Sequence, residues 1–292
     1  MILELSPLKS DALRQRLPEF VPEVRLRDKF SLSALQKAPL SPKAVIVNFC
    51  ELMQIGRIRS HIALLRRVLG GVRPLIFSAV GRDHLLDELD MRQYHKAAVE
   101  LGADWVISPD DYVYQADSGY SFYQNAHFSR ALGRALALTR LGRDKYRVVG
   151  LAIGSSFYQL REFVRALAEQ GIDTFAYPCG DLLKRARNPK SELIQISEFV
   201  HYLQGLRYRC LLLGINSPRL VRQLKPDMWA SGAWSFDASR GVYYSSDGTP
   251  VRGRELRCGH KECAATDLSS VERMTLHNLI ARARLSWNEG GP

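Results

Sequence analysis

The sequence predicts an α/β protein of the (β/α)8 barrel class, a TIM barrel, with a zinc-binding appendage towards the C-terminal end. Three observations lead to this prediction. From Ala44 onward, short apolar runs alternate with amphipathic stretches of helical period, which is typical of βα units around a parallel sheet. Seven such runs, with one strand expected from the N-terminal section, give the eight strands of a barrel. Cysteine and histidine residues then cluster from Cys258 onward.

The chain divides into three expected regions. Residues 1–43 are interrupted by prolines and predict an N-terminal edge segment with loops that leads into the main domain. The barrel core is expected over residues 44–250. Residues 251–292 are expected to form a zinc-binding subdomain that completes the barrel.

The expected strands share a short apolar run: Ala44–Asn48, Pro74–Val80, Trp105–Ser108, Arg147–Ile153, Thr174–Tyr177, Cys210–Gly214 and Asp227–Ala230. The expected helices share apolar residues at helical spacing: Ile58–Leu69, Met91–Leu101, Ala126–Leu141, Tyr158–Gln170, Ser191–Leu206 and Pro218–Leu224. Several of these helices end next to a glycine, as helices commonly do. The alternative is a doubly wound open sheet, but no Gly-x-Gly-x-x-Gly follows the first strand.

The composition points to a polyanionic partner. The 292 residues have a formal net charge of +11 and 46% hydrophobic content, enough for one sizeable core. Arginine outnumbers lysine, and its planar guanidinium suits phosphate oxygens, so we expect a nucleic acid partner. The basic loop carrying Arg185, Arg187 and Lys190 follows a strand and is expected to meet a phosphate backbone. The alternatives are a merely basic soluble enzyme and a solvated charged loop.

The cysteines and the hydropathy indicate a reducing compartment. Cys50, Cys179 and Cys210 lie in apolar runs and are expected to be buried thiols. The sequence shows no secretion signal pattern and no apolar run of about 18 residues, the length that would cross a membrane. We therefore expect a cytoplasmic protein with no membrane partner.

The C-terminal cluster has the donor types of a tetrahedral zinc site, namely Cys258, His260, Cys263 and His277. Ser269 and Glu272 have the spacing of a capping box, so His277 is expected to project from the first turns of a helix towards the segment 258–263. The alternative is two unrelated cysteines, a surface histidine and a histidine packed at a domain edge.

This region resembles the tRNA-guanine transglycosylase superfamily. Thr275-Leu276-His277-Asn278-Leu279 resembles the family's Thr-x-His-Asn-Leu, and Cys258, His260 and Cys263 fall on its Cys-x-Cys-x-x-Cys, with histidine in the middle position. Weaker resemblances follow in chain order at Arg73–Ile76, Trp105–Asp111, Gly150–Ser155, Tyr177–Leu182, Leu213–Pro218 and Tyr244–Gly248. Together they cover roughly residues 70–292.

The resemblance implies an activity and a site. Such enzymes exchange a guanine in tRNA for a 7-deazaguanine, and one branch does so in DNA. One aspartate attacks the anomeric carbon, a second manages protons, and Zn²⁺ is the only cofactor. Asp110 and Asp111 are expected to contact the base, although one of them could instead cap a helix. Gly154 and Gly180 are expected at the strand ends that line the base pocket.

The sequence departs from this pattern at both catalytic aspartates. By strand register the nucleophile falls on Ala230, and the second aspartate falls near Ser78. Asp237, in a Phe-Asp pair that resembles one of the family, is the candidate catalytic residue, if the loop after the last strand folds back. The alternative is that Asp237 begins a turn or caps a short helix.

Two hypotheses of different classes follow from these residues. The first is base exchange in tRNA or DNA, with guanine or 7-deazaguanine as the small ligand. The second is a non-catalytic nucleic-acid-binding subunit that has lost the aspartates and pairs with a related chain. A homodimer or a heterodimer fits either hypothesis, and a barrel enzyme of other chemistry is a third interpretation.

Overall fold

The structure is a computed structural model. It describes residues 19–26, 28–38, 44–69, 75–111, 121–180, 183, 189–246, 248–253, 263 and 268–286.

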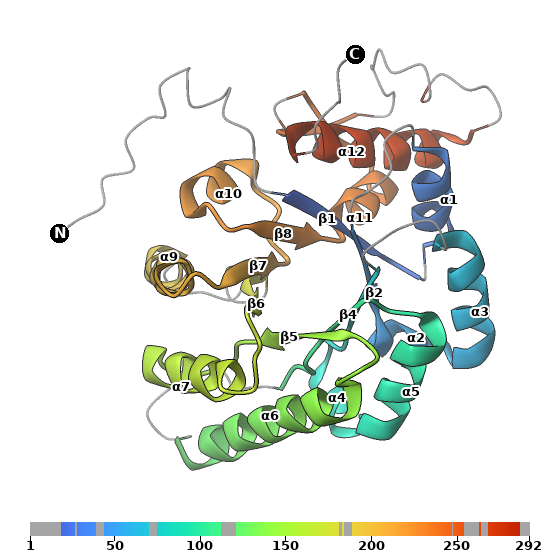
Figure 1. Ribbon diagram of the computed structural model, residues 1–292. Coiled ribbons are helices and arrows are strands. Elements are labelled where there is room, and N and C mark those ends of the chain that lie inside the picture. Colours follow the sequence, from blue (N-terminus) through green and yellow to red (C-terminus); the bar gives the residue numbers. More distant parts are fainter. Residues whose placement is uncertain are drawn as a thin grey trace.

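Eight parallel strands form a closed barrel in the order of the sequence (Figure 1). The strands are β1 (Glu19–Val24), β2 (Val45–Asn48), β3 (Leu75–Ser78), β4 (Trp105–Ile107), β5 (Arg147–Leu151), β6 (Thr174–Pro178), β7 (Arg209–Leu213) and β8 (Met228–Ser231). Parallel pairing of β1 with β8, from Glu19↔Met228 to Pro22↔Ser231, closes the sheet. The predicted barrel is confirmed, and the open-sheet alternative is excluded.

Helices surround the barrel, as the periodicity predicted. The long ones are α3 (Ile58–Leu69), α5 (Met91–Leu101), α6 (Ser121–Gly142), α7 (Phe157–Ala168), α9 (Pro189–Gly205) and α12 (Ser270–Ser286). The shorter ones are α1 (Lys29–Lys37), α2 (Phe49–Ile55), α4 (Asp83–Asp87), α10 (Pro218–Leu224) and α11 (Ala233–Ser239). The bounds of α3, α5 and α10 agree with the sequence prediction. No helix was predicted for α1, α2 and α4, and a turn or a short helix was expected near Asp237, where the structure has α11.

The strand expected from the N-terminal section is β1, so the segment 1–43 contributes directly to the barrel. Its apolar residues Phe20, Val21 and Val24 are fully buried. The ring of Phe20 packs on Trp229 of β8 with centroids 4.6 Å apart, so the first and last strands are held by side chains as well as by backbone pairing.

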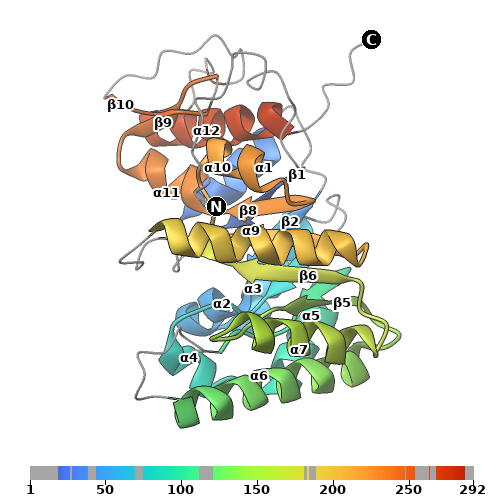
Figure 2. The ribbon, with the colours of Figure 1, turned by 90° about the vertical axis from the view of Figure 1, so that its left-hand side faces the viewer.

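Helix α12 begins with the predicted capping box. The Ser269 N–H donates to Glu272 Oε2 at 2.9 Å, and the Glu272 N–H donates to Ser269 Oγ at 3.3 Å. The helix packs against α11, α1 and the strand β9 (Val242–Tyr244) (Figure 2). Strand β9 forms an antiparallel hairpin with β10 (Pro250–Arg252).

Asn278 joins α12 to its neighbours. Its Nδ2 donates to the carbonyls of Trp234 and Val242 at 3.0 and 2.9 Å, and its Oδ1 accepts from the Tyr244 N–H at 3.0 Å. Both N–H donors of this buried amide and one acceptor position of its oxygen are therefore used to position α11 and β9. Within the described residues, no helix has both the length and the apolar content needed to cross a bilayer.

Candidate functional site

The carboxyl ends of all eight parallel strands meet at one mouth of the barrel, where the loops of such folds gather their chemistry. The strand arrowheads in Figure 2 point to this mouth. The predicted residues Asp110, Gly154 and Gly180 follow β4, β5 and β6 there. Two residues that the sequence analysis did not select, Glu23 and Asn48, lie at the ends of β1 and β2.

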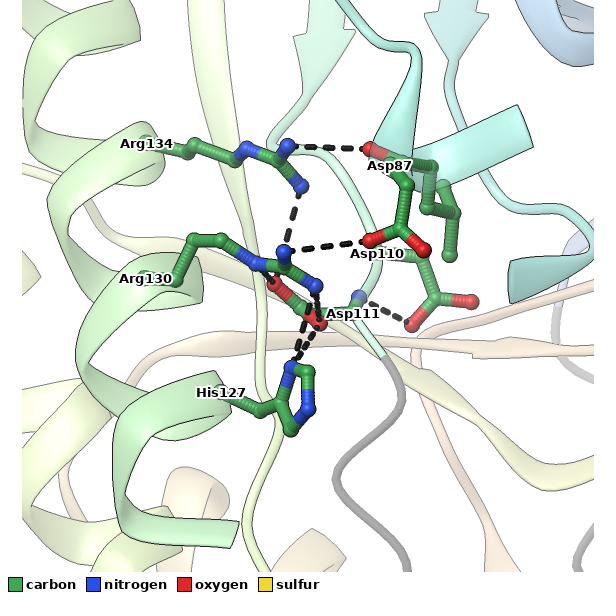
Figure 3. A network of polar contacts seen from close by, with 7 residues as sticks. Asp87, Asp110, Asp111, His127, Arg130 and Arg134 are labelled. Atoms are coloured by element: carbon green, nitrogen blue, oxygen red, sulfur yellow. Dashed lines mark hydrogen bonds and ion pairs between the residues drawn. The ribbon is translucent and has the colours of Figure 1, made fainter. Parts of the chain in front are cut away.

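The Asp111 side chain is fully buried and surrounded by Arg130, Arg134 and His127 of α6 (Figure 3). Its Oδ2 accepts from Arg130 Nε at 2.6 Å, and its Oδ1 accepts from Arg130 Nη2 at 2.7 Å. His127 Nδ1 lies 3.0 Å from Oδ1, and Arg134 Nη1 lies 3.5 Å from Oδ2. Both oxygens are committed to a two-pronged ion pair. Asp111 therefore fixes α6 to the end of β4.

The same arginines hold a third element. Arg130 Nη1 lies 3.1 Å from Asp87 Oδ1, and Arg134 Nη2 donates to the Leu86 carbonyl at 2.9 Å. Helix α4 is thereby tied to α6 across the end of β4. None of the three side chains Arg130, Arg134 and His127 of α6 was selected from the sequence, because they lie 16 or more positions after Asp111.

Asp110 has different surroundings from its neighbour. Its N–H donates to the Ala79 carbonyl at 2.9 Å, and its Oδ1 accepts from the Asp111 N–H at 2.8 Å. Its half-buried carboxylate is turned away from the arginines of α6 (Figure 3). Burial, and then the nearby Asp110 charge, raise the pKa of the Cys50 thiol to about 12. Of the two predicted base contacts, Asp111 is committed to α6, and the contact of Asp110 with a base stays a prediction.

Gly154 and Gly180 stand where the chain has no room for a side chain. A Cβ on Gly180 would lie 3.0 Å from the Gly214 Cα, and a Cβ on Gly154 would lie 2.9 Å from the Gln159 Cβ. Close packing of the β6 and β7 ends thus explains Gly180. The predicted contact of both glycines with a base stays a prediction.

Glu23 and Asn48 form a polar pair at the mouth. The Asn48 Nδ2 lies 2.7 Å from the Val80 carbonyl and 3.4 Å from Glu23 Oε1. The other carboxylate oxygen, Glu23 Oε2, lies 3.6 Å from the position that a Cβ on Gly232 would take. Glu23 therefore lies between the ends of β2 and β8. A carboxylate within the apolar run of β1 is the sequence signal that could have identified Glu23.

The two positions that lack the expected aspartates are both buried. Ala230 of β8 pairs with Val21 and with Leu213 of the flanking strands. Ser78 of β3 pairs with Asn48 of β2. Neither side chain provides a carboxylate to the mouth.

Asp237 lies in α11, after the end of β8. Its Oδ2 accepts a hydrogen bond from the Tyr244 hydroxyl. Tyr244 is buried, and the guanidinium carbon of Arg282 from α12 lies 3.9 Å from its ring centroid. The described contact thus directs Asp237 towards α12. Since β4 and β8 lie on opposite sides of an eight-stranded barrel, the segments that carry Asp110 and Asp237 follow strands on opposite sides of it.

Two of the four predicted zinc ligands, Cys258 and His260, lie outside the described residues, as do Arg185 and Arg187. Among the described residues, no group of three or more metal-binding side chains occurs. Cys263 and His277 are both buried.

The surroundings of His277 are compatible with its predicted role as a metal ligand. Its Nε2 lies 2.6 Å from the Tyr244 carbonyl and donates to it, so the lone pair is on the buried Nδ1. Burial lowers the pKa of His277, which keeps the ring neutral. A neutral imidazole that donates its other N–H to a backbone carbonyl is the usual arrangement around zinc. His277 therefore fits the predicted site.

Aromatic and basic side chains lie close to the mouth. Phe236 of α11 is 36% exposed, with the guanidinium carbons of Arg25 and Arg240 at 4.8 and 4.1 Å from its ring centroid. Tyr158, at the start of α7, is 72% exposed. Lys190, at the start of α9, is also exposed. Of these residues, only Lys190 was predicted from the sequence as a contact to nucleic acid.

No protein-family model and no curated protein sequence matches this chain. The function is therefore argued from the fold and the residues at the mouth.

Proposed function

We propose that this protein exchanges a guanine in tRNA or DNA for a 7-deazaguanine, in the manner of the transglycosylases that its sequence resembles. The observation that carries the proposal is the difference between Asp110 and Asp111. Arg130 and His127 occupy the carboxylate of Asp111, whereas the Asp110 carboxylate is turned away from them at the end of a barrel strand. An aspartate so placed can accept the paired N–H groups of a purine edge.

The nucleic acid part of the proposal is supported by the charge and by Phe236. A net charge of +11 favours a polyanion. An exposed ring with an arginine over it offers a base a stacking surface and a phosphate a counter-charge. The basic loop with Arg185, Arg187 and Lys190 would extend this surface.

Zinc has a structural part in the proposal. Cys258, His260, Cys263 and His277 would hold the ion, and it would fasten the segment 258–263 to α12 without entering the reaction. Substituting His277 by alanine is expected to abolish the bound zinc, whereas the same change at the exposed His201 is expected to leave it at one ion per chain. Metal analysis by mass spectrometry measures both variants.

A cytoplasmic location completes the proposal. Cys50, Cys179 and Cys210 are buried free thiols, as predicted. Such thiols are common in reducing compartments.

The attacking carboxylate is the weak point of the resemblance. Asp237 would have to leave Tyr244 and turn towards the mouth to serve as the nucleophile. Ala230 and Ser78, at the positions of the two family aspartates, favour the second candidate function, a non-catalytic nucleic-acid-binding subunit. In a heterodimer, the partner chain would then supply the chemistry.

Exchange of radiolabelled guanine into tRNA or DNA separates the two functions. The first predicts incorporation by the purified chain alone, and the second predicts it only after a related partner chain is added. If Asp237 attacks, Asp237→Asn loses exchange while it keeps its zinc. Retained exchange in Asp237→Asn would remove this residue from the role.

A further inference from the structure

We propose that Glu23 is the carboxylate that attacks the sugar. This inference rests on the proposed base exchange and supplies the nucleophile that Ala230 cannot provide. Glu23 lies in the N-terminal segment, outside the part of the chain that resembles the family.

Strand register directs Glu23 into the barrel. Phe20 pairs with Trp229, and Trp229 Nε1 donates to Ser286 Oγ of α12 at 3.3 Å, so this pair faces the outer helices. Paired residues of neighbouring strands share a face, and successive residues alternate. Val21 and its partner Ala230 therefore face inward, and so does Glu23, two positions further towards the mouth.

Glu23 is consequently beside the end of β8. Its Oε2 lies 3.6 Å from the position of a Cβ on Gly232, two residues beyond Ala230. Because Gly232 has no side chain, the Glu23 carboxylate shares the space between the two strand ends with the aliphatic part of Arg25, whose Cγ and Cδ lie 3.4 and 3.5 Å from the same position. A glutamate is one methylene longer than an aspartate and starts from the adjacent strand. It can thus reach the space above Ala230.

Neighbouring groups hold Glu23 in this place. The Trp234 Nε1 donates to the Glu23 carbonyl at 3.2 Å, which fixes the backbone at the end of β1. Asn48 Nδ2, anchored on the Val80 carbonyl, lies 3.4 Å from Glu23 Oε1. One oxygen is thereby oriented by an amide, and the second is directed towards Gly232. A positioned carboxylate is what nucleophilic attack on a sugar requires.

The reaction balances without a further reagent. A Glu23 oxygen forms a bond to C1′, the C1′–N9 bond breaks, and the electron pair leaves with guanine, which takes up a proton from water. The incoming 7-deazaguanine then loses a proton to water and attacks C1′, and the C1′–O bond breaks to restore the carboxylate. Two inversions give net retention at C1′.

The test compares two glutamates of one strand. Glu23→Gln removes the nucleophile with little change in shape, and Glu19→Gln is its control at the opposite end of β1. Exchange of labelled guanine is expected to fall about a thousandfold or more in Glu23→Gln and to stay unchanged in Glu19→Gln. Zinc content and the thermal midpoint should match wild type in both variants.

A second measurement needs no variant. Wild-type protein mixed with its nucleic acid in the absence of an incoming base should retain a covalent nucleotide. After nuclease and trypsin treatment, the adduct is expected on the peptide 17–25, with fragment ions that place it on Glu23.

The outcomes are distinct. Full exchange in Glu23→Gln, or an adduct on the peptide 223–240 that contains Asp237, would overturn the role of Glu23 and leave base exchange in place. No exchange and no adduct with wild-type protein, alone or with a partner chain, would overturn both proposals.

Discussion

Asp110 and Asp111 are neighbours in the sequence, but only Asp111 forms an ion pair with the arginines of α6. Replacing Asp111 by asparagine leaves Arg130, Arg134 and His127 around a neutral group. We expect a loss of about 3–5 kcal/mol in the free energy of unfolding, the usual cost of breaking a buried ion pair. Urea denaturation measures it. The control Asp110→Asn is expected to cost about 1 kcal/mol or less and to weaken guanine binding. Equal losses from the two substitutions would contradict the assignment.

The buried thiol of Cys50 makes the free energy of unfolding depend on pH. The thiol pKa is 9.0 in an exposed reference and about 12 in the folded protein, because burial and Asp110 disfavour the thiolate. Above about pH 9 the unfolded chain therefore loses a proton that the folded chain keeps, and this contribution to stability declines as the pH rises.

The contribution of Cys50 to the free energy of unfolding is expected to fall by about 1.4 kcal/mol per pH unit between the two pKa values. It is measured as the difference between wild type and Cys50→Ala in unfolding free energy at about pH 9 and about pH 11. A difference that does not change with pH would show that Cys50 titrates normally. Subtracting the variant cancels the other buried thiols and phenols.

At the scale of elements, the segments with a clear helical period could be predicted from the sequence, including the short α10, whereas α1, α2 and α4 were not predicted. Helices α3, α5 and α10 have the predicted bounds, and the capping box of α12 is confirmed. In contrast, the residues of α11 left a turn and a short helix both open for Asp237, and the structure places Asp237 within the helix.

Part of the candidate site could also be predicted from local sequence patterns. Strand ends identified Asp110 and Asp111, because residues there reach the mouth of a barrel. Their separate roles depend on contacts with Arg130 and His127, which lie beyond the reach of local patterns. Glu23 was missed because pairing of β1 with β8 joins positions more than about 200 residues apart, and no local rule encodes such a contact.

The ends of β6 and β7 permit a test at this scale. Gly214 has φ +76°, and a Cβ there would lie 2.8 Å from the Gly180 Cα. Gly214→Ala should therefore lower the free energy of unfolding by about 2–4 kcal/mol, from a strained φ and from overpacking.

Gly102→Ala is the matched control for the strained backbone. Gly102 has φ +74° with open space around its Cα, so only the backbone cost of about 1–2 kcal/mol is expected. Similar losses at Gly214 and Gly102 in chemical denaturation would mean that the two strand ends are not packed as closely as described.

At the scale of the whole molecule, the mouth is the expected face for nucleic acid. Phe236→Ala should weaken binding of tRNA or single-stranded DNA by about 1–3 kcal/mol, the usual contribution of one stacked base. Arg240→Ala should also lower the slope of log affinity against log salt by about one. Fluorescence anisotropy at several salt concentrations measures both.

The control for this face is the exposed Arg147, at the start of β5 and thus at the opposite end of the barrel. Arg147→Ala is expected to leave affinity and salt slope almost unchanged. If it weakens binding as much as Arg240→Ala does, the nucleic acid is attracted by overall charge and does not select the mouth.

The whole account depends on a purine base entering the mouth between Asp110 and Glu23. A crystal structure with guanine or a 7-deazaguanine tests this most directly. We expect the base in the mouth, with its N–H edge within hydrogen-bond distance of the Asp110 carboxylate and its N9 directed across the barrel towards Glu23. A base bound outside the mouth, or a mouth that stays without ligand at saturating base, would contradict the account.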